Sequence, residues 1–351
     1  MKILLVADFD YSDYNLLQYF QNGLLALGHD VARFSILPKL NSNLEDHVKF
    51  NSFNIFKKRL INNLVNNKFL LNKQKTFTDL KKIIEEFKPD FLITAKGHNL
   101  SEELLSFLHE EKIQVFNFYS DPIPYDNPLF LKMIPLYTCI LTYNKDHIPG
   151  WYLLGAKKVA YLPFASDPQV HRPLSLSKDD RVKYGSPIAC LATWQPYAEY
   201  WPEKLLQFGL KIWGNQWYKL PKDSPLRKVW QGEGQGINQY FPLVCQASNI
   251  VFNVVRPKNG QSHSMKTFEI PASGGFMLSN RTEDQLKFFP EDIAAVYFST
   301  EEELLDKIKF YFKHEEKRTA ISLKGLEIAQ NHRYIQRMQT IVDLFKQTIK
   351  V

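Results

Sequence analysis

Short apolar runs alternate with segments of helical periodicity along most of the chain. These runs fall into two series, one in each half of the sequence. The predicted strands are residues 3–7, 31–35, 91–95, 115–119, 139–142 and 158–162, followed by 188–192, 210–213, 250–254, 275–278 and 295–298. Because strands separated by helix-length segments form βαβ units, the pattern predicts an α/β protein with two doubly wound parallel sheets.

Helix signals support this interpretation. Residues 15–27 have apolar positions at helical spacing and end before Gly28, a residue suited to a left-handed cap. Thr300 followed by 301–303, all glutamate, has the sequence of a capping box, and apolar residues then recur on one helix face.

Prolines mark the expected domain boundary. Four of them occur between 163 and 187, where no periodicity is evident. The predicted organisation is an N-terminal Rossmann-like domain (1–165), a linker (166–186), a C-terminal Rossmann-like domain (187–331) and a final helical segment (332–351) that crosses back to the first domain.

The composition is that of an ordinary globular protein. Of its 351 residues, 44% are hydrophobic and 23% are charged. No apolar run approaches the roughly 20 residues that span a bilayer, and the first residues suit a buried strand better than a secretory signal. Cys139, Cys190 and Cys245 have no metal-binding spacing, which favours reduced thiols and a cytoplasmic location.

Positive charge is concentrated in one unusual segment. The net charge is +7, and residues 49–78 contain lysines and an arginine among apolar residues but no acid. A basic amphipathic helix suits an anionic membrane face, here the inner face of the membrane. It equally suits a peripheral helix that packs its apolar stripe on the sheet. The pattern leaves both interpretations open.

The stretch from Arg256 to Leu278 has the order of a ligand site. A predicted strand is followed by a glycine-containing loop, a helix start near 263–267 and a second strand. Ligands of open α/β sheets bind at the carboxyl ends of strands, where helix N-termini present N–H groups. Lys258 and Lys266, together with Arg256, would add positive charge beside a diphosphate. Taken singly, each residue also fits an ordinary surface loop.

A family resemblance becomes specific in this segment. Residues 266–278 (KTFEIPASGGFML) and 301–318 (EEELLDKIKFYFKHEEKR) resemble the C-terminal domain of GT-B glycosyltransferases, above all the spore-maturation-protein-like branch. A weaker similarity is to a phage DNA β-glucosyltransferase. The resemblance is good over 186–330 and thin over 1–165. It implies a GT-B fold, with two facing Rossmann-like domains and an interdomain cleft, and the transfer of a sugar from a nucleotide-sugar donor to an acceptor hydroxyl.

The resemblance also implies roles for single residues. Glu269 matches the ribose-binding glutamate and Lys266 the basic residue that faces the phosphates. Thr193 and Trp194 match the loop over the diphosphate, and Gly214 a close approach beside the nucleotide. The whole expected donor set is Glu269, Lys266, Arg256, Thr267, Thr193, Trp194, Gly214 and His263.

Two departures from the family pattern affect the mechanism. Many retaining relatives have a second glutamate eight residues before the ribose glutamate, where this chain has Gln261. The arginines of the phage enzyme have no counterpart in 193–204, where Lys204 is the one cation. Phosphate neutralisation is therefore expected from Arg256 and Lys266, and the missing acid favours inversion of the anomeric centre.

The first domain offers a catalytic base. Asp121 follows the predicted strand 115–119 and precedes a proline; it resembles the proposed base of the phage enzyme. An Asx turn is the alternative, since Asp-Pro commonly begins turns. His98, after the strand 91–95, is the second candidate, and Lys96 would contact an anionic acceptor. We interpret the acids at 8, 10 and 13 as helix caps, so no metal and no cofactor besides the donor is expected.

Other functions remain as alternatives. A retaining glycosyltransferase or a sugar-nucleotide epimerase would share the architecture, although an epimerase needs acids around the sugar, and Gln261 is not one. The basic charge would also suit a nucleic-acid-binding protein, but no nucleic-acid-binding motif is present. The expected partners are a nucleotide-sugar donor and a glycan, lipid-linked or other hydroxyl acceptor, a nucleic-acid acceptor being less favoured.

Overall fold

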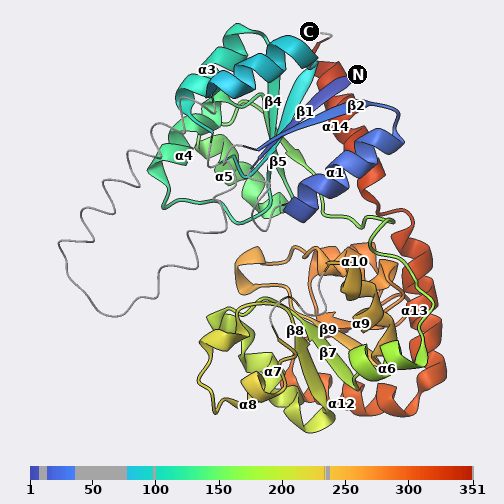
Figure 1. Cartoon of the computed structure of the whole chain (residues 1–351). Coiled ribbons are helices and arrows are strands. Elements are labelled where there is room, and N and C mark those ends of the chain that lie inside the picture. Colours follow the sequence, from blue (N-terminus) through green and yellow to red (C-terminus); the bar gives the residue numbers. More distant parts are fainter. Residues whose placement is uncertain (8–13, 36–76, 98–99, 233, 235–237, 350–351) are drawn as a thin grey trace, which may run out of the picture. The chain divides into compact units, whose positions relative to one another are not determined.

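The computed structural model divides the chain into two compact units (Figure 1). Unit 1 comprises Met1–Thr142, His147–Leu162 and Met338–Val351, and unit 2 comprises Tyr143–Asp146 and Pro163–Arg337. The structure describes residues 1–7, 14–35, 77–97, 100–232, 234 and 238–349. His98, the acids at 8, 10 and 13 and all but the last two residues of the basic segment 49–78 lie outside this description, so their roles stay predictions.

Unit 1 is built on a parallel sheet. Among the described residues it has six strands in the order β2-β1-β3-β4-β5-β6, and every neighbouring pair is parallel. The strands are β1 (Lys2–Ala7), β2 (Asp30–Ser35), β3 (Phe91–Ala95), β4 (Gln114–Tyr119), β5 (Cys139–Thr142) and β6 (Val159–Tyr161). Most of their side chains are buried on both faces, as expected for parallel strands between helix layers.

Helices cover both faces of this sheet (Figure 1). They are α1 (Tyr14–Ala26), α3 (Glu102–Glu110), α4 (Pro128–Met133), α5 (Ile148–Leu153) and the part of α14 (Tyr334–Thr348) from residue 338 onward; residues 77–87 are helical as well. Phe345 of α14 stacks on Phe91 at 4.4 Å between ring centroids. Trp151 of α5 packs edge-on against Tyr119 at 5.0 Å. These aromatic contacts hold α14 to one face of the sheet and α5 to the other.

Unit 2 repeats the architecture. Its described residues form a five-stranded parallel sheet in the order β11-β10-β9-β7-β8. The strands are β7 (Ile188–Leu191), β8 (Leu210–Trp213), β9 (Ile250–Asn253), β10 (Met277–Asn280) and β11 (Val296–Phe298). The helices are α6 (Lys178–Tyr184), α7 (Tyr200–Leu205), α8 (Pro225–Lys228), α9 (Phe241–Ala247), α10 (Lys266–Ala272), α11 (Glu283–Phe288), α12 (Glu301–Lys313) and α13 (Glu315–Ala329).

The predicted fold class is confirmed: two parallel sheets alternate with helices, and each predicted strand occurs with its ends shifted by at most two residues. Gly28 has φ 77°, the expected left-handed conformation after α1. The capping prediction holds in part. Thr300 accepts a hydrogen bond from the Glu303 amide, but the Glu303 carboxylate accepts from the amide of Ser299 instead of that of Thr300.

The stretch 166–186 differs from the predicted linker. It lies inside unit 2 and contains α6, which begins with a capping box between Ser177 and Asp180. Asp167 and His171 in the same stretch are buried. The prolines therefore shape a packed turn before α6, and proline frequency alone does not distinguish such a turn from an exposed connection.

Candidate functional site

Polar side chains tie together the carboxyl ends of β9 and β10, the strands that stand before and after the segment 254–272 along the chain. Asn253, at the end of β9, donates from Nδ2 to Ser279 Oγ at 3.1 Å. Asn280, at the end of β10, accepts from the Val255 amide at 2.7 Å. Both contacts keep the ends of β9 and β10 side by side, so the loop 254–265 and α10 begin from a fixed edge of the sheet.

Glu269 lies in the first turn of α10 and is buried, with 7% of its surface exposed. Burial raises the pKa of its carboxyl group to about 7, and the charge of Lys266 offsets only part of that effect. Its Oε1 is 3.6 Å from Nε2 of His171, which burial keeps neutral by lowering its pKa to about 3. Glu269 is thus a buried carboxyl group that faces a neutral imidazole.

The expected cations differ in burial and in what is known of their effect on this carboxyl group. Lys266 is half-buried, and its charge acts on Glu269 and on the Cys190 thiol in β7. Arg256 is exposed. The helix N-terminus contributes less than expected, because the amides of residues 264 and 267–269 already donate to acceptors within the segment. Positive charge for an anionic ligand would come mainly from side chains.

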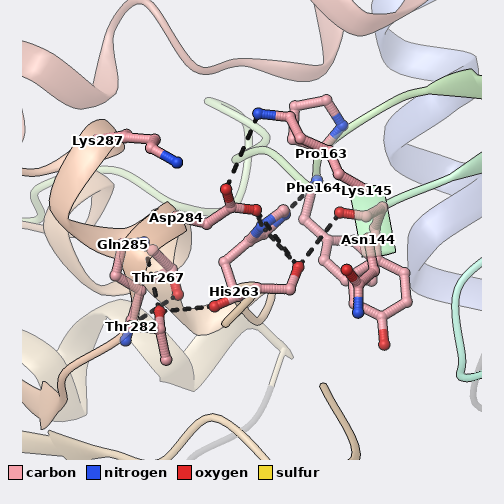
Figure 2. Close-up of polar contacts among 12 residues, drawn as sticks. Asn144, Lys145, Pro163, Phe164, His263, Thr267, Thr282, Asp284, Gln285 and Lys287 are labelled. Atoms are coloured by element: carbon pink, nitrogen blue, oxygen red, sulfur yellow. Dashed lines mark hydrogen bonds and ion pairs between the residues drawn. The ribbon is translucent and has the colours of Figure 1, made fainter. Parts of the chain in front are cut away.

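His263 and Thr267 do not have the ligand-facing position predicted for them. His263 is fully buried: its Nε2 accepts from the Phe164 amide at 3.2 Å, so Nδ1 donates to Asp284 Oδ2 at 3.2 Å (Figure 2). Thr267 donates to Gln285 Oε1 at 3.1 Å. Burial lowers the pKa of His263 although Asp284 opposes that effect. Both side chains are committed to protein partners and position the loop.

A second set of contacts fastens the same loop from a distant part of the sequence. Tyr143 donates from its hydroxyl to Asn259 Oδ1 at 3.0 Å, and Asn144 donates to the Asn259 carbonyl at 3.1 Å. Lys145 lies 3.9 Å from the Asp284 carboxylate (Figure 2). Residues 143–146 therefore hold the loop that connects β9 to α10 in one conformation.

The backbone conformation at position 214 and a close neighbouring carbonyl group both require a glycine. Gly214 has φ 121°, and a Cβ atom there would lie 2.4 Å from the carbonyl oxygen of Ala192, just after β7. The indole of Trp217 donates to that same oxygen at 2.7 Å. The close approach seen at Gly214 is between the ends of β7 and β8. The predicted approach of Gly214 to the nucleotide stays a prediction. Beside it, Thr193 is exposed and Trp194 is half-buried, with its indole N–H bound to Glu199 at 3.0 Å.

The two departures from the family pattern have local roles. Gln261 accepts from the Glu283 amide through its side-chain oxygen at 3.3 Å and from the Asp284 amide through its carbonyl at 3.1 Å. It therefore satisfies the N-terminus of α11. Lys204 pairs with Glu301 at 3.1 Å, which ties α7 to α12.

In unit 1, Asp121 and Lys96 meet at the carboxyl edge of the sheet. Lys96 Nζ lies 3.1 Å from Asp121 Oδ2, with side chains 24% and 33% exposed. Lys96 has φ 59°, and its carbonyl accepts from Asn117 Nδ2 at 3.2 Å. Tyr137 donates to the carbonyl of the next residue, Gly97, at 3.2 Å. The turn that presents Lys96 is thereby fixed, and this lysine contacts the candidate base.

Comparisons with known proteins agree with this architecture. The model of a family described as glycosyl transferase-like matches residues 198–343. The spore protein CgeB of Bacillus subtilis (strain 168) is 24% identical over 258 residues, which cover 67% of this chain and 76% of CgeB. The chain therefore has the fold of GT-B glycosyltransferases, and its residues 198–343 are glycosyl transferase-like.

Solved structures show the fold over the whole length of the chain. Sucrose-phosphate synthase (tll1590) from Thermosynechococcus elongatus has a TM-score of 0.65 at 12% identity. The match covers 100% of this chain and 99% of the synthase chain. Alr3699/HepE of Anabaena, in complex with UDP-glucose, has a TM-score of 0.65 at 12% identity over 99% of this chain and 100% of its own.

Two kinds of feature are absent from the described part of the chain. Within those residues no group of three or more histidines, cysteines, aspartates or glutamates could hold a metal ion. Over the same residues, no helix is both long enough and apolar enough to cross a bilayer.

His171, Asp284 and the segment 143–146 were not among the residues predicted from the sequence. A helix start around Asp284 could have been predicted, because Thr282 and Gln285 have the spacing of a helix cap. In the structure, Thr282 accepts a hydrogen bond from the Gln285 amide. No sequence pattern indicated His171, since it lies in the stretch predicted as a linker.

Proposed function

We propose that this protein is a glycosyltransferase that moves a sugar from a UDP-sugar to an acceptor hydroxyl, with the donor bound by unit 2. The observation that supports this most is Glu269, a buried carboxyl group in the first turn of the helix that follows β9. The two ribose hydroxyls would donate to its carboxylate and replace the water lost on burial. HepE, which has the same fold, was solved with UDP and with UDP-glucose, which supports uridine as the base.

The phosphates would lie toward Lys266 and Arg256. These two cations, one half-buried and one exposed, would neutralise the diphosphate and stabilise it as it leaves. Thr193 and Trp194 follow β7 at the same edge and would cover the phosphates from the other side.

The chemistry we propose is single displacement without a metal ion. Asp121 would accept the proton of the acceptor hydroxyl as that oxygen attacks the anomeric carbon, while the bond to the diphosphate breaks on the opposite face. Lys96, in contact with the Asp121 carboxylate, would hold it in place. Gln261 supports inversion, because its side-chain oxygen is bonded to an amide of α11 and it is not an acid.

The acceptor would be a glycan, a lipid-linked sugar or another hydroxyl compound. Contact of the basic segment 49–78 with an anionic membrane belongs to the same proposal, and a liposome assay with and without anionic lipid tests it. Equal binding to both liposomes would leave the segment as ordinary protein surface.

A nucleotide-sugar screen tests the donor assignment. At 100 times its dissociation constant, a ligand stabilises the folded protein by about 2.7 kcal/mol, so thermal shifts with UDP-glucose, GDP-mannose and dTDP-glucose should single out UDP-glucose. Turnover with labelled donor then distinguishes transfer from epimerisation, and NMR of the product gives its anomeric configuration. A retained configuration would overturn the inverting mechanism, and a shift with GDP-mannose alone would overturn the choice of uridine.

A further inference from the structure

His171 is held rigidly beside Glu269. It lies in the turn before α6, with 5% of its surface exposed. Its Nδ1 accepts from the Asp167 amide at 3.0 Å, and its own amide donates to the Asp167 carbonyl at 2.7 Å. The edge of the Phe241 ring from α9 packs on the imidazole at 5.6 Å between centroids. The ring therefore has a defined position and orientation.

The turn is itself anchored at its start. The Ser166 amide donates to the His332 carbonyl at 2.9 Å, and the Tyr334 amide donates to the Ser166 carbonyl at 2.9 Å. Asp167 Oδ1 accepts from the Gln169 amide at 2.8 Å. A residue held by this many backbone contacts does not move freely when its neighbours change.

The hydrogen bond at Nδ1 determines the tautomer. Because Nδ1 accepts, the proton of the neutral ring is on Nε2, and Nε2 lies 3.6 Å from Glu269 Oε1. This separation is a few tenths of an ångström longer than an N–H···O hydrogen bond. An ionised carboxylate would close the gap, since hydrogen bonds to charged acceptors are shorter and stronger.

We propose that His171 is a positioning residue for donor recognition: its Nε2–H holds Oε1 of the Glu269 carboxylate and leaves Oε2 to the ribose hydroxyls. This inference rests on the proposed donor site. A glutamate has three rotatable side-chain bonds, so a fixed donor at one oxygen lowers the entropy cost of orienting the other.

The surroundings leave Glu269 as the group that titrates near neutral pH in this set. His171 stays neutral because burial lowers its pKa, and burial raises the pKa of the Cys245 thiol on α9 well above its ordinary value. Lys266 on α10 opposes the rise in the pKa of Glu269 through its positive charge. A change in the pH dependence of donor binding would therefore report on the Glu269 carboxyl group.

The test compares two substitutions of His171 by titration calorimetry with UDP-glucose between pH 5 and 8. His171→Gln keeps an N–H group near the Nε2 position, whereas His171→Leu keeps the volume and removes the donor. We expect the Leu variant to bind about 10- to 100-fold more weakly at pH 8, as for a hydrogen bond to a charged group. Its pH midpoint should also rise, while the Gln variant stays within about threefold of the unmodified chain.

The outcomes separate this inference from the donor site. If Glu269→Gln binds UDP-glucose as tightly as the unmodified chain, or that chain does not bind it, the donor site is wrong and the role of His171 falls with it. If Glu269→Gln binds weakly but His171→Leu keeps the original affinity and pH midpoint, only the role of His171 is refuted. A Leu variant that loses thermal stability but keeps both values refutes it equally, because His171 is then structural.

Discussion

Binding of UDP-glucose should become tighter as the pH rises from 5 to 8, because it needs the Glu269 carboxylate. Burial raises the pKa of this group from 4.5 to about 7, so most of the free protein has it protonated at pH 5. A protonated carboxyl group has one oxygen that donates, and it therefore accepts poorly from two ribose hydroxyls. Binding must then release a proton, and the affinity follows the ionised fraction.

The size of the effect follows from that pKa. The ionised fraction rises roughly 100-fold between pH 5 and pH 8, so the dissociation constant should fall roughly 100-fold, which is about 3 kcal/mol. The unliganded protein should respond in the opposite sense. Its folded-state pKa exceeds the unfolded value, so the stability from Glu269 is present below pH 4.5 and is lost as the pH rises through 7, by about 3 kcal/mol.

Calorimetry with Glu269→Gln tests both statements. The variant should bind UDP-glucose weakly and without this pH dependence, yet unfold at a higher temperature than the unmodified chain at pH 8. UDP-glucose is a better probe than UDP, whose terminal phosphate itself titrates near pH 6. Glu283→Gln is the matched control, since Glu283 is exposed and pairs only loosely with Lys287 at 3.5 Å. Affinity that is flat with pH, or pH dependence that persists in Glu269→Gln, would refute the reasoning.

Three further predictions concern other parts of the molecule. Asp121→Asn should lower turnover by roughly 10²–10⁴-fold and leave UDP-glucose affinity unchanged; near-normal turnover would remove Asp121 as the base. Gly214→Ala should cost more stability in denaturant unfolding than Gly28→Ala, since both have positive φ but only Gly214 meets a backbone atom; equal costs would contradict the contact. Asp284→Ala should destabilise by about 1–3 kcal/mol because it leaves His263 Nδ1–H without its acceptor, and Asp284→Asn should restore most of that loss.

Much of the fold is predictable from local patterns. Each strand of both sheets is a short apolar run bounded by turn residues, and parallel strands buried on both faces have this appearance. The stretch 166–186 was mispredicted because its order comes from contacts that are not local. Ser166 bonds to residues 332 and 334, and the Leu174 amide donates to Gln246. No window of sequence contains both partners of such a bond.

The order of the candidate site residues along the chain was predictable, but the directions of their side chains were not. Glu269 and Lys266 stand at a recognisable distance after β9, which is enough to place them at the carboxyl edge of the sheet. His263 belongs to the same segment, yet it points to Asp284 and Phe164 instead of a ligand. Helix periodicity does not determine a side-chain direction in a loop, so a residue that positions the loop and one that contacts the donor look alike in the sequence.

The surroundings of the two candidate carboxylates explain why the donor site carries the functional assignment. Asp121 is one-third exposed and faces a lysine ammonium group. Surface ion pairs of this kind change the folding free energy little, and many of them have no function. Glu269 is buried and faces a neutral imidazole, so its ionised form is costly in the unliganded protein. Such a cost is offset when a ligand supplies the missing donors, which a ribose with two hydroxyl groups would do. Unit 2 therefore gives the stronger reason to place the sugar nucleotide there.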